Sequence, residues 1–290
     1  SPRFTGDLSS LWKLQNLPPI HHLTWDWWWW LVMLDDEGGN PAGKQLMVLW
    51  STKDNPLVEV NGHPWKPVGR PGFDEDGGIA MDGMVAAWWY DGKELIEPLV
   101  LEEGRILVIS EDHPKWPYPK GGIVASYTEN ELSMGLNPGE DEFWLILETK
   151  HGKFDLRMTP WNNAMSSMKV AQAEYGLGMG YGISRLHGAL CAGTIDGSEV
   201  NGSAYFQKVC VQAPSPPWFW GMLHLDDGSY IDWFVPHVSP TLTAKDSRHW
   251  KRRDITHYPL SMGGLFHDVS RQRSEKFSEV RVDRTCNEHG

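Results

Sequence analysis

HHLTWDWWWWLVML, residues 21–34, is the stretch that decides the fold, because tryptophan fills most of its centre. Read at a period of two residues, it predicts a β-strand with two distinct faces. One face carries His22, Thr24, Asp26, Trp28, Trp30 and Val32, and the other carries Leu23, Trp25, Trp27, Trp29, Leu31 and Met33. Both faces are aromatic, so we expect other parts of the protein to cover both.

Asp26 is the one carboxylate in this aromatic strand. Burial of an unpartnered carboxylate costs several kcal/mol, so Asp26 must be hydrogen-bonded, protonated or placed at a cavity. Apolar surroundings favour the protonated form, which makes Asp26 a candidate proton donor. The alternative is a structural carboxylate with its own hydrogen-bond partners, and both interpretations stay open at this point.

Composition bounds the class of protein. A chain of 290 residues with 40% apolar content and 17 tryptophans can bury one large core or two ordinary ones. The formal charge of -12, from 26 basic and 38 acidic residues, argues against non-specific nucleic-acid binding and against anionic membrane surfaces. No window approaches about 18 uninterrupted apolar residues, so we expect no integral membrane segment.

The cysteines indicate a reducing environment. Cys191, Cys210 and Cys286 cannot all pair with one another, and no Cys-x-x-Cys spacing occurs. We therefore expect free thiols and a cytoplasmic location. The oligomeric state cannot be derived from the sequence.

Short apolar runs separated by turn residues predict an all-β protein built as an antiparallel sandwich or barrel. Strands are expected at 45–50, 78–90, 99–110, 122–127, 131–136, 143–149, 153–158, 185–195, 199–212, 218–225, 229–235 and 275–285. Residues 161–175 are the one helix-like or linker segment. This predicts two β domains in tandem, residues 1–165 and 166–290.

Three groups of motifs resemble the family that contains AttH and hydroxyneurosporene synthase, which includes carotenoid hydratases, kievitone hydratase and Diels-Alderase relatives. The groups are 26–30 (DWWWW) with 43–46 (GKQL), 184–186 (SRL) with 193–197 (GTIDG) and 200–205 (VNGSAY), and 218–220 (WFW) with 223–228 (LHLDDG). The resemblance implies two lipocalin-like β domains with an apolar pocket for an isoprenoid, a polyketide or a similar lipophilic molecule. The chain departs from the family pattern at Gln207, which cannot act as a general acid.

Hydration, dehydration or cyclisation of an alkene needs an acid, a base or water, and apolar walls that exclude solvent. Aromatic rings can also stabilise a developing cation. Asp26 is the first acid candidate, and His22 on the same strand face could relay its proton. His224 could take part from the far end of an aromatic stripe. The candidate walls are Trp28 and Trp30.

Further candidates for substrate binding lie in the second half of the chain. Trp218 and Trp220 share a strand face with His224, and this face could point inward or outward. Tyr205 shares a face with Gln207, and Arg185 shares a face with His187. Each of these residues could bind a hydroxyl or carbonyl group, or serve only as a structural hydrogen-bonding residue.

Other chemistries find little support. The histidines have no metal-ligand spacing, so no metal site is expected. No nucleophile elbow and no dinucleotide fingerprint occur, and we expect no cofactor. The leading hypothesis is a cofactor-independent lyase (hydratase) or isomerase (cyclase) acting on a lipophilic unsaturated molecule. The alternative is a lipocalin-like carrier that binds such a molecule unchanged.

Overall fold

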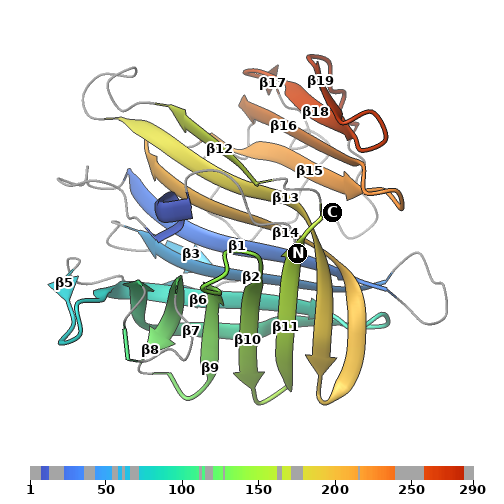
Figure 1. Cartoon of the computed structure of the whole chain (residues 1–290). Coiled ribbons are helices and arrows are strands. Elements are labelled where there is room, and N and C mark those ends of the chain that lie inside the picture. Colours follow the sequence, from blue (N-terminus) through green and yellow to red (C-terminus); the bar gives the residue numbers. More distant parts are fainter. Residues whose placement is uncertain are drawn as a thin grey trace. The chain divides into compact units, whose positions relative to one another are not determined.

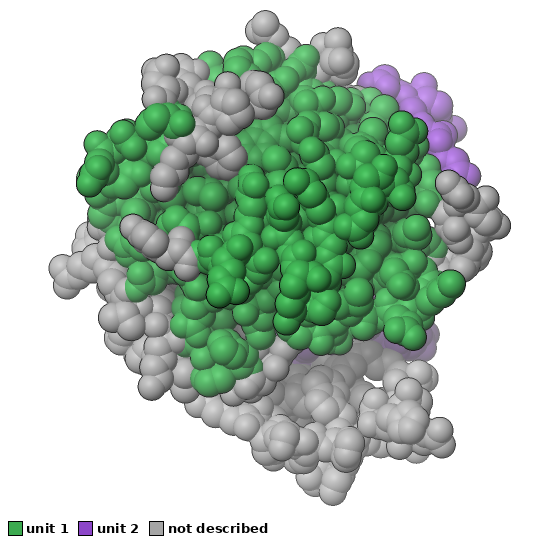
Figure 2. All heavy atoms as spheres, turned by 90° about the horizontal axis from the view of Figure 1, so that it is seen from below, with its two compact units in different colours: residues 1–213 green, residues 214–290 purple. Residues whose placement is uncertain are grey.

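The structure is a computed structural model that describes residues 8–12, 23–35, 43–53, 58–60, 63–65, 72–110, 113–114, 120–126, 128–161, 165–170, 179–214, 216–238 and 258–283. Within these ranges the elements are β-strands, apart from one short 3₁₀ helix, η1 (Leu8–Trp12), so the all-β prediction is confirmed. None of the described helical residues forms a segment of the length and apolarity needed to cross a bilayer. The chain divides into two compact units, Ser1–Ala213 and Pro214–Gly290 (Figure 2).

The first unit contains a closed antiparallel barrel (Figure 1). Its ten strands follow the order β11-β10-β9-β8-β7-β6-β2-β1-β14-β13, and pairing of β13 with β11 closes the ring. Their bounds are β1 Thr24–Leu34, β2 Lys44–Lys53, β6 Ile79–Tyr90, β7 Leu95–Ser110, β8 Gly121–Ser126, β9 Glu131–Leu136, β10 Phe143–Thr149, β11 Gly152–Pro160, β13 Gly180–Ile195 and β14 Ser198–Gln212.

Four shorter strands accompany the barrel. β5 (Gly72–Phe73) pairs with β6, and β12 (Met165–Val170) pairs with β13. β3 (Val58–Val60) and β4 (His63–Trp65) form a separate two-stranded sheet.

β1 is the tryptophan-rich strand, and it lies between β2 and β14 in the barrel wall (Figure 1). Its burial alternates strictly, with the face of Trp28 and Trp30 buried and the face of Trp27 and Trp29 half-buried. This alternation follows from the two-residue period of a strand, which sends one face into the barrel interior.

The interior is packed around three fully buried tryptophans, Trp28 and Trp30 on β1 and Trp50 on β2. Each indole N–H donates within this core: Trp28 Nε1 to the Leu11 carbonyl at 2.7 Å, Trp50 Nε1 to the Leu132 carbonyl at 3.2 Å, and Trp30 Nε1 to Met134 Sδ at 3.1 Å. Burial of these three tryptophans therefore carries no penalty from unmade indole hydrogen bonds. Leu11 is itself fully buried, so η1 contributes to the core.

Two glycines permit the close backbone approach at the long-range pairings of the barrel. A Cβ at Gly202 of β14 would lie 2.1 Å from the Met33 carbonyl oxygen of β1. A Cβ at Gly193 of β13 would lie 2.1 Å from the Asp155 carbonyl oxygen of β11, and Gly193 has a φ of +153°. Neither distance is possible for a side chain, so glycine is required at both places.

The division between the units lies at a different place from the boundary expected between residues 165 and 166. β13 and β14 belong to the first unit because they pair with β11 and β1. The segment expected as a helix or linker at 161–175 contains strand β12. Pairing between strands so distant in sequence leaves no trace in local turn signals, which explains the difference.

The second unit is a smaller antiparallel sheet with the order β15-β16-β18-β19, and β17 pairs with β16. The strands are β15 Trp218–His224, β16 Tyr230–Val238, β17 Tyr258–Pro259, β18 Gly263–Asp268 and β19 Arg273–Phe277. The strand expected at 275–285 ends at Phe277, which is opposite Gly264 near the start of β18. The alternation of polar and apolar residues in the sequence continues beyond Phe277, but the pairing with β18 ends there.

We predict that Gly202→Ala destabilises the protein by about 1–3 kcal/mol, because the added methyl must displace the backbone of β1. Gly182→Ala is the matched control, since a Cβ on that β13 glycine would meet nothing within 4 Å. Its effect should stay within about 0.5 kcal/mol. Urea unfolding followed by tryptophan fluorescence measures both, and equal losses would contradict the observed packing.

Candidate functional site

A buried ion pair links β1 and β14, which are neighbours in the barrel although they are far apart in the sequence. Lys208 Nζ on β14 lies 2.6 Å from Asp26 Oδ1 on β1, and both side chains are almost completely buried. Cys210 is opposite Asp26, and Lys208 is opposite Trp28, so the two charged residues are diagonal neighbours. This position accounts for the partner that Asp26 requires.

The Lys208 ammonium makes two further contacts. It donates to the Val209 carbonyl at 3.2 Å, and it lies 3.8 Å from the ring centroid of Trp28. All three contacts are of the kind that a cationic lysine makes, since the ammonium has three hydrogens and the indole face is negative. The aromatic strand therefore supports the cation as well as lining the interior.

Polar side chains surround the pair on the inward face of the barrel. Thr24 Oγ1 donates to Gln212 Oε1 at 2.7 Å, and both residues are buried. By strand register, Thr52 of β2 lies opposite Asp26, and Ser184 of β13 lies opposite Lys208. Inward-facing Trp28, Trp30 and Phe206 continue the same strands. The interior thus has a polar end and an apolar, aromatic remainder.

Gly182 leaves open space beside this polar end. Gly182 of β13 lies opposite Cys210 of β14 and is on the same strand face as the buried Ser184. The residue is half-buried, and an added Cβ would meet nothing within 4 Å. The ion pair is therefore next to an inward position that is not filled by side chains of the described residues.

Trp30 lies deeper in the apolar region than Trp28. Its ring centroid is 4.7 Å from that of Phe206 and 5.4 Å from that of Phe143. Trp28 contacts the charged end through Lys208, whereas Trp30 is enclosed by aromatic rings. The two candidate wall residues thus occupy successive inward positions at increasing distance from the charges.

The structure brings four other sequence candidates together on the opposite, outward face of β13 and β14. Arg185 is opposite Gln207 in the register. The Tyr205 hydroxyl donates to Gln207 Oε1 at 3.1 Å, and the Tyr205 ring lies 6.2 Å from that of His187. Tyr205 and His187 are buried. These four residues form one group, which is separated from Asp26 by the barrel wall.

The remaining candidates lie elsewhere. His22 falls outside the described residues. Trp218, Trp220 and His224 are on β15 of the second unit. Trp218 is 40% exposed, while Trp220 Nε1 donates to Asp232 Oδ1 at 3.0 Å.

Lys208 is the site residue that the sequence analysis missed. Its signal was the alternation of β14, in which Phe206, Lys208, Cys210 and Gln212 share a face. A lysine on the buried face of a strand needs an anionic partner, and Asp26 was the acid for which burial had been expected. Only the antiparallel register of β1 with β14 connects the two observations.

The thiols of Cys210, which is opposite Asp26, and of Cys191, which lies elsewhere on β13, are poor nucleophiles. Burial raises the pKa of the Cys210 thiol to about 12, and the neighbouring Asp26 adds to this rise while Lys208 opposes it. Burial alone raises the pKa of Cys191 to about 12. A thiol with such a pKa is protonated near neutrality and is therefore not activated for attack. Neither cysteine is therefore a good candidate for covalent catalysis.

Comparisons with known proteins found similar chains among the solved structures alone. No protein-family model matches the chain, and no curated protein matches it. Among solved structures, a protein from Nitrosomonas europaea assigned to AttH is similar at 13% identity, with a TM-score of 0.49, over 96% of this chain and 78% of that protein. CghA with Sch210972 is similar at 9% identity, with a TM-score of 0.44, over 88% of this chain and 75% of that protein.

We predict strong energetic coupling between Asp26 and Lys208. Removal of either charge alone, by Asp26→Leu or Lys208→Met, should cost about 3–5 kcal/mol because the other charge is left buried and unpaired. The double variant should lose less than either single variant, since no charge then remains to be desolvated. A double-mutant cycle measured by urea unfolding tests this, and additive losses would contradict the contact.

We also predict a loss of stability in alkaline solution that depends on Cys210. The folded-state pKa of about 12 lies above the ordinary value of 9.0, so the folded protein retains a proton that the unfolded chain releases. The stabilisation is complete below pH 9 and declines as the pH rises from about 9 to 12, by up to about 1.4 kcal/mol per pH unit for one thiol. Cys210→Ala should make this decline shallower by that slope in unfolding measurements between pH 9 and 11. An unchanged slope would contradict the assignment.

Proposed function

We propose that this chain is a cofactor-independent enzyme of the hydratase, cyclase or isomerase type, which acts on a lipophilic unsaturated small molecule by acid–base chemistry. The observation that carries the proposal is the buried Asp26–Lys208 pair, placed between open space at Gly182 and an aromatic interior. A proton acceptor and a proton donor thus lie together where apolar walls exclude bulk water.

Stability gives little reason for such a pair. A buried ion pair often contributes no more than well-packed apolar side chains of the same volume would, because desolvation of two charges offsets their attraction. Ionisable groups that are buried next to each other also occur at sites that transfer protons. The position of Asp26 and Lys208 therefore supports a functional role.

The contacts of the pair favour a different catalytic role for each of its two residues. Lys208 is the donor and Asp26 the acceptor in their hydrogen bond. The proposal therefore gives Asp26 the role of a base, in place of the acid role expected from the sequence. In an isomerisation, Asp26 would accept a proton from a carbon next to a carbonyl group, while Lys208 would stabilise the negative charge that develops on the carbonyl oxygen. Return of the proton to another carbon of the same conjugated system completes the reaction without net change in atoms. The Val209 carbonyl, at 3.2 Å from Lys208, is the contact that a substrate oxygen can replace.

The sign of the charge narrows the substrate class. A lysine ammonium repels a carbocation on a neighbouring carbon but attracts a developing oxyanion. The pair therefore favours alkenes conjugated to a carbonyl group, as in polyketides and oxidised isoprenoids, over isolated alkenes. Trp28 and Trp30 would contact the apolar part of such a molecule and keep water away from it.

A carrier is the second candidate, and one observation favours it. The three contacts of the Lys208 ammonium, with Asp26, Val209 and Trp28, satisfy it fully without a substrate. A pair held so firmly could simply solvate the polar end of a ligand that leaves unchanged. Roles for His22 and His224 in either function remain predictions. A reducing compartment also belongs to the proposal, and the free thiols of Cys191 and Cys210 support it.

The test uses the purified full chain with long-chain conjugated enones and, for comparison, the corresponding isolated alkenes. Chromatography and mass spectrometry should detect isomers of equal mass, or a mass change of one water, from the enones alone. Asp26→Asn and Lys208→Arg should lower turnover by about 10²-fold or more, since a positioned acid or base contributes about that factor. Gly182→Leu should also block turnover by filling the open space, although it leaves both charges in place.

Asp82→Asn is the matched control. Asp82 also forms an ion pair, with Arg105 at 2.9 Å, but this pair is partly exposed and does not lie in the barrel interior. It should retain wild-type turnover. Thermal midpoints of all variants separate loss of chemistry from loss of folding. Enone that is retained tightly and recovered unchanged from the folded wild-type protein would overturn the enzymatic proposal and support the carrier.

A further inference from the structure

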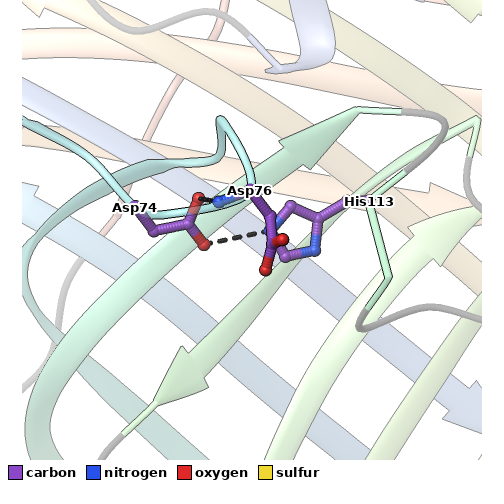
Figure 3. Close-up of side chains that lie close together, drawn as sticks. All are labelled: Asp74, Asp76 and His113. Carbon is purple, nitrogen blue, oxygen red and sulfur yellow. Dashed lines mark hydrogen bonds and ion pairs between the residues drawn. The ribbon is translucent and has the colours of Figure 1, made fainter.

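Three side chains that could bind a metal ion lie close together, and none of them is near Asp26 or Lys208 in the sequence. Asp74 and Asp76 lie in the turn between β5 and β6, and His113 follows the end of β7. One ligand atom from each residue lies within 4.8 Å of the other two (Figure 3). No metal site was expected, because the histidines have no metal-ligand spacing along the chain. Asp74 and His113 are 39 positions apart. Sequence spacing carries no sign of this proximity.

The histidine distinguishes this group from an ordinary cluster of surface acids. His113 is 3% exposed, and its Nε2 points at the Asp74 carboxylate, 3.0 Å from Oδ2. The other oxygen of Asp74 accepts hydrogen bonds from the backbone N–H groups of Gly78 at 2.6 Å and Asp76 at 3.1 Å. Backbone donors therefore hold the carboxylate in the direction of the imidazole, as outer-shell partners do in metal sites.

The separation of the two inner atoms suits a shared ion. Nitrogen and oxygen ligands lie about 2.0–2.2 Å from a small transition-metal cation. Two such atoms 3.0 Å apart subtend an angle of about 90° at the ion, which is the angle between adjacent ligands in octahedral coordination. The exposed Asp76 carboxylate lies next to the imidazole ring and can supply the third ligand (Figure 3).

Gly78 provides a second, independent observation. A Cβ at this position would lie 3.2 Å from both Asp74 Oδ1 and His113 Nε2, and 2.7 Å from Leu107 Cδ1. The backbone of Gly78 does not occupy the left-handed region, so the local conformation does not require glycine. Close packing against Leu107 already excludes a side chain here, and its absence also keeps the space beside the aspartate and the imidazole clear.

We propose that Asp74, Asp76 and His113 bind one divalent first-row transition-metal cation in octahedral coordination, such as Mn²⁺ or a six-coordinate Zn²⁺. A ligand set of one imidazole and two carboxylates favours these ions over Ca²⁺ and Mg²⁺, which prefer oxygen alone. Water completes the coordination. The ion fastens the turn that precedes β6 to the segment that follows β7, so its role is structural and independent of the proposed acid–base site.

The test is calorimetric titration of the full chain, stripped of metal by chelator and dialysed, with ZnCl₂ and with MnCl₂. Binding of one ion per chain and a rise in thermal midpoint are expected, with a much weaker response to MgCl₂. Asp76→Asn removes an exposed ligand and leaves the Asp74–His113 contact intact, so it should fold normally and lose affinity by roughly tenfold or more.

Glu75→Gln is the matched control, because it removes the same charge from the same turn without touching the cluster. Its affinity and its metal-dependent rise in thermal midpoint should equal those of the wild type. An Asp74–His113 contact that acts only as an ion-free latch predicts no saturable binding by the wild-type chain. That result, or equal binding by Asp76→Asn and Glu75→Gln, would overturn the proposal.

Discussion

The antiparallel pairing of β1 with β14 is the constraint on which the rest of the barrel depends. It joins strands whose facing residues Asp26 and Cys210 are separated by most of the first unit, and it places the Lys208 ammonium against the Asp26 carboxylate. A shift by one residue would turn Asp26 outward and bring Trp25 or Trp27 inward, since the faces of a strand alternate. The ion pair therefore forms only in the register in which β1 and β14 pair in the barrel.

The aromatic core and the charged pair depend on each other. Trp28 donates its indole N–H to Leu11 and presents its ring to Lys208, so one side chain satisfies both the core and the cation. The apolar interior weakens the screening of the Asp26–Lys208 attraction and at the same time makes either charge costly when alone. Such a pair can exchange protons only with a molecule that enters the interior, which connects the fold to the proposed chemistry.

The local part of the structure could be predicted from the sequence. Alternation and turn residues located most strands of both units, and the tryptophan stretch identified β1 and its hairpin partner β2. The need of Asp26 for a partner was also evident from its aromatic neighbours. Lys208 could not be assigned as that partner, because the choice among distant cations depends on the order of strands in the barrel. Asp74 and His113 escaped detection for the same reason, and so did the meeting of Arg185 with Gln207 across β13 and β14. The end of β19 at Phe277 likewise depends on where its partner begins.

Incorporation of solvent deuterium tests the central claim most directly. If Asp26 and Lys208 move protons to and from a bound enone, incubation with the wild-type protein in D₂O will add deuterium to the recovered molecule, as measured by mass spectrometry. Asp26→Asn, compared as folded protein under the same conditions, will add none above the rate in buffer. Equal incorporation by the wild-type protein and Asp26→Asn would contradict the assignment of Asp26 as the proton acceptor. No incorporation by the wild-type protein, despite binding of the enone, would show that the ion pair holds its ligand without acting on it.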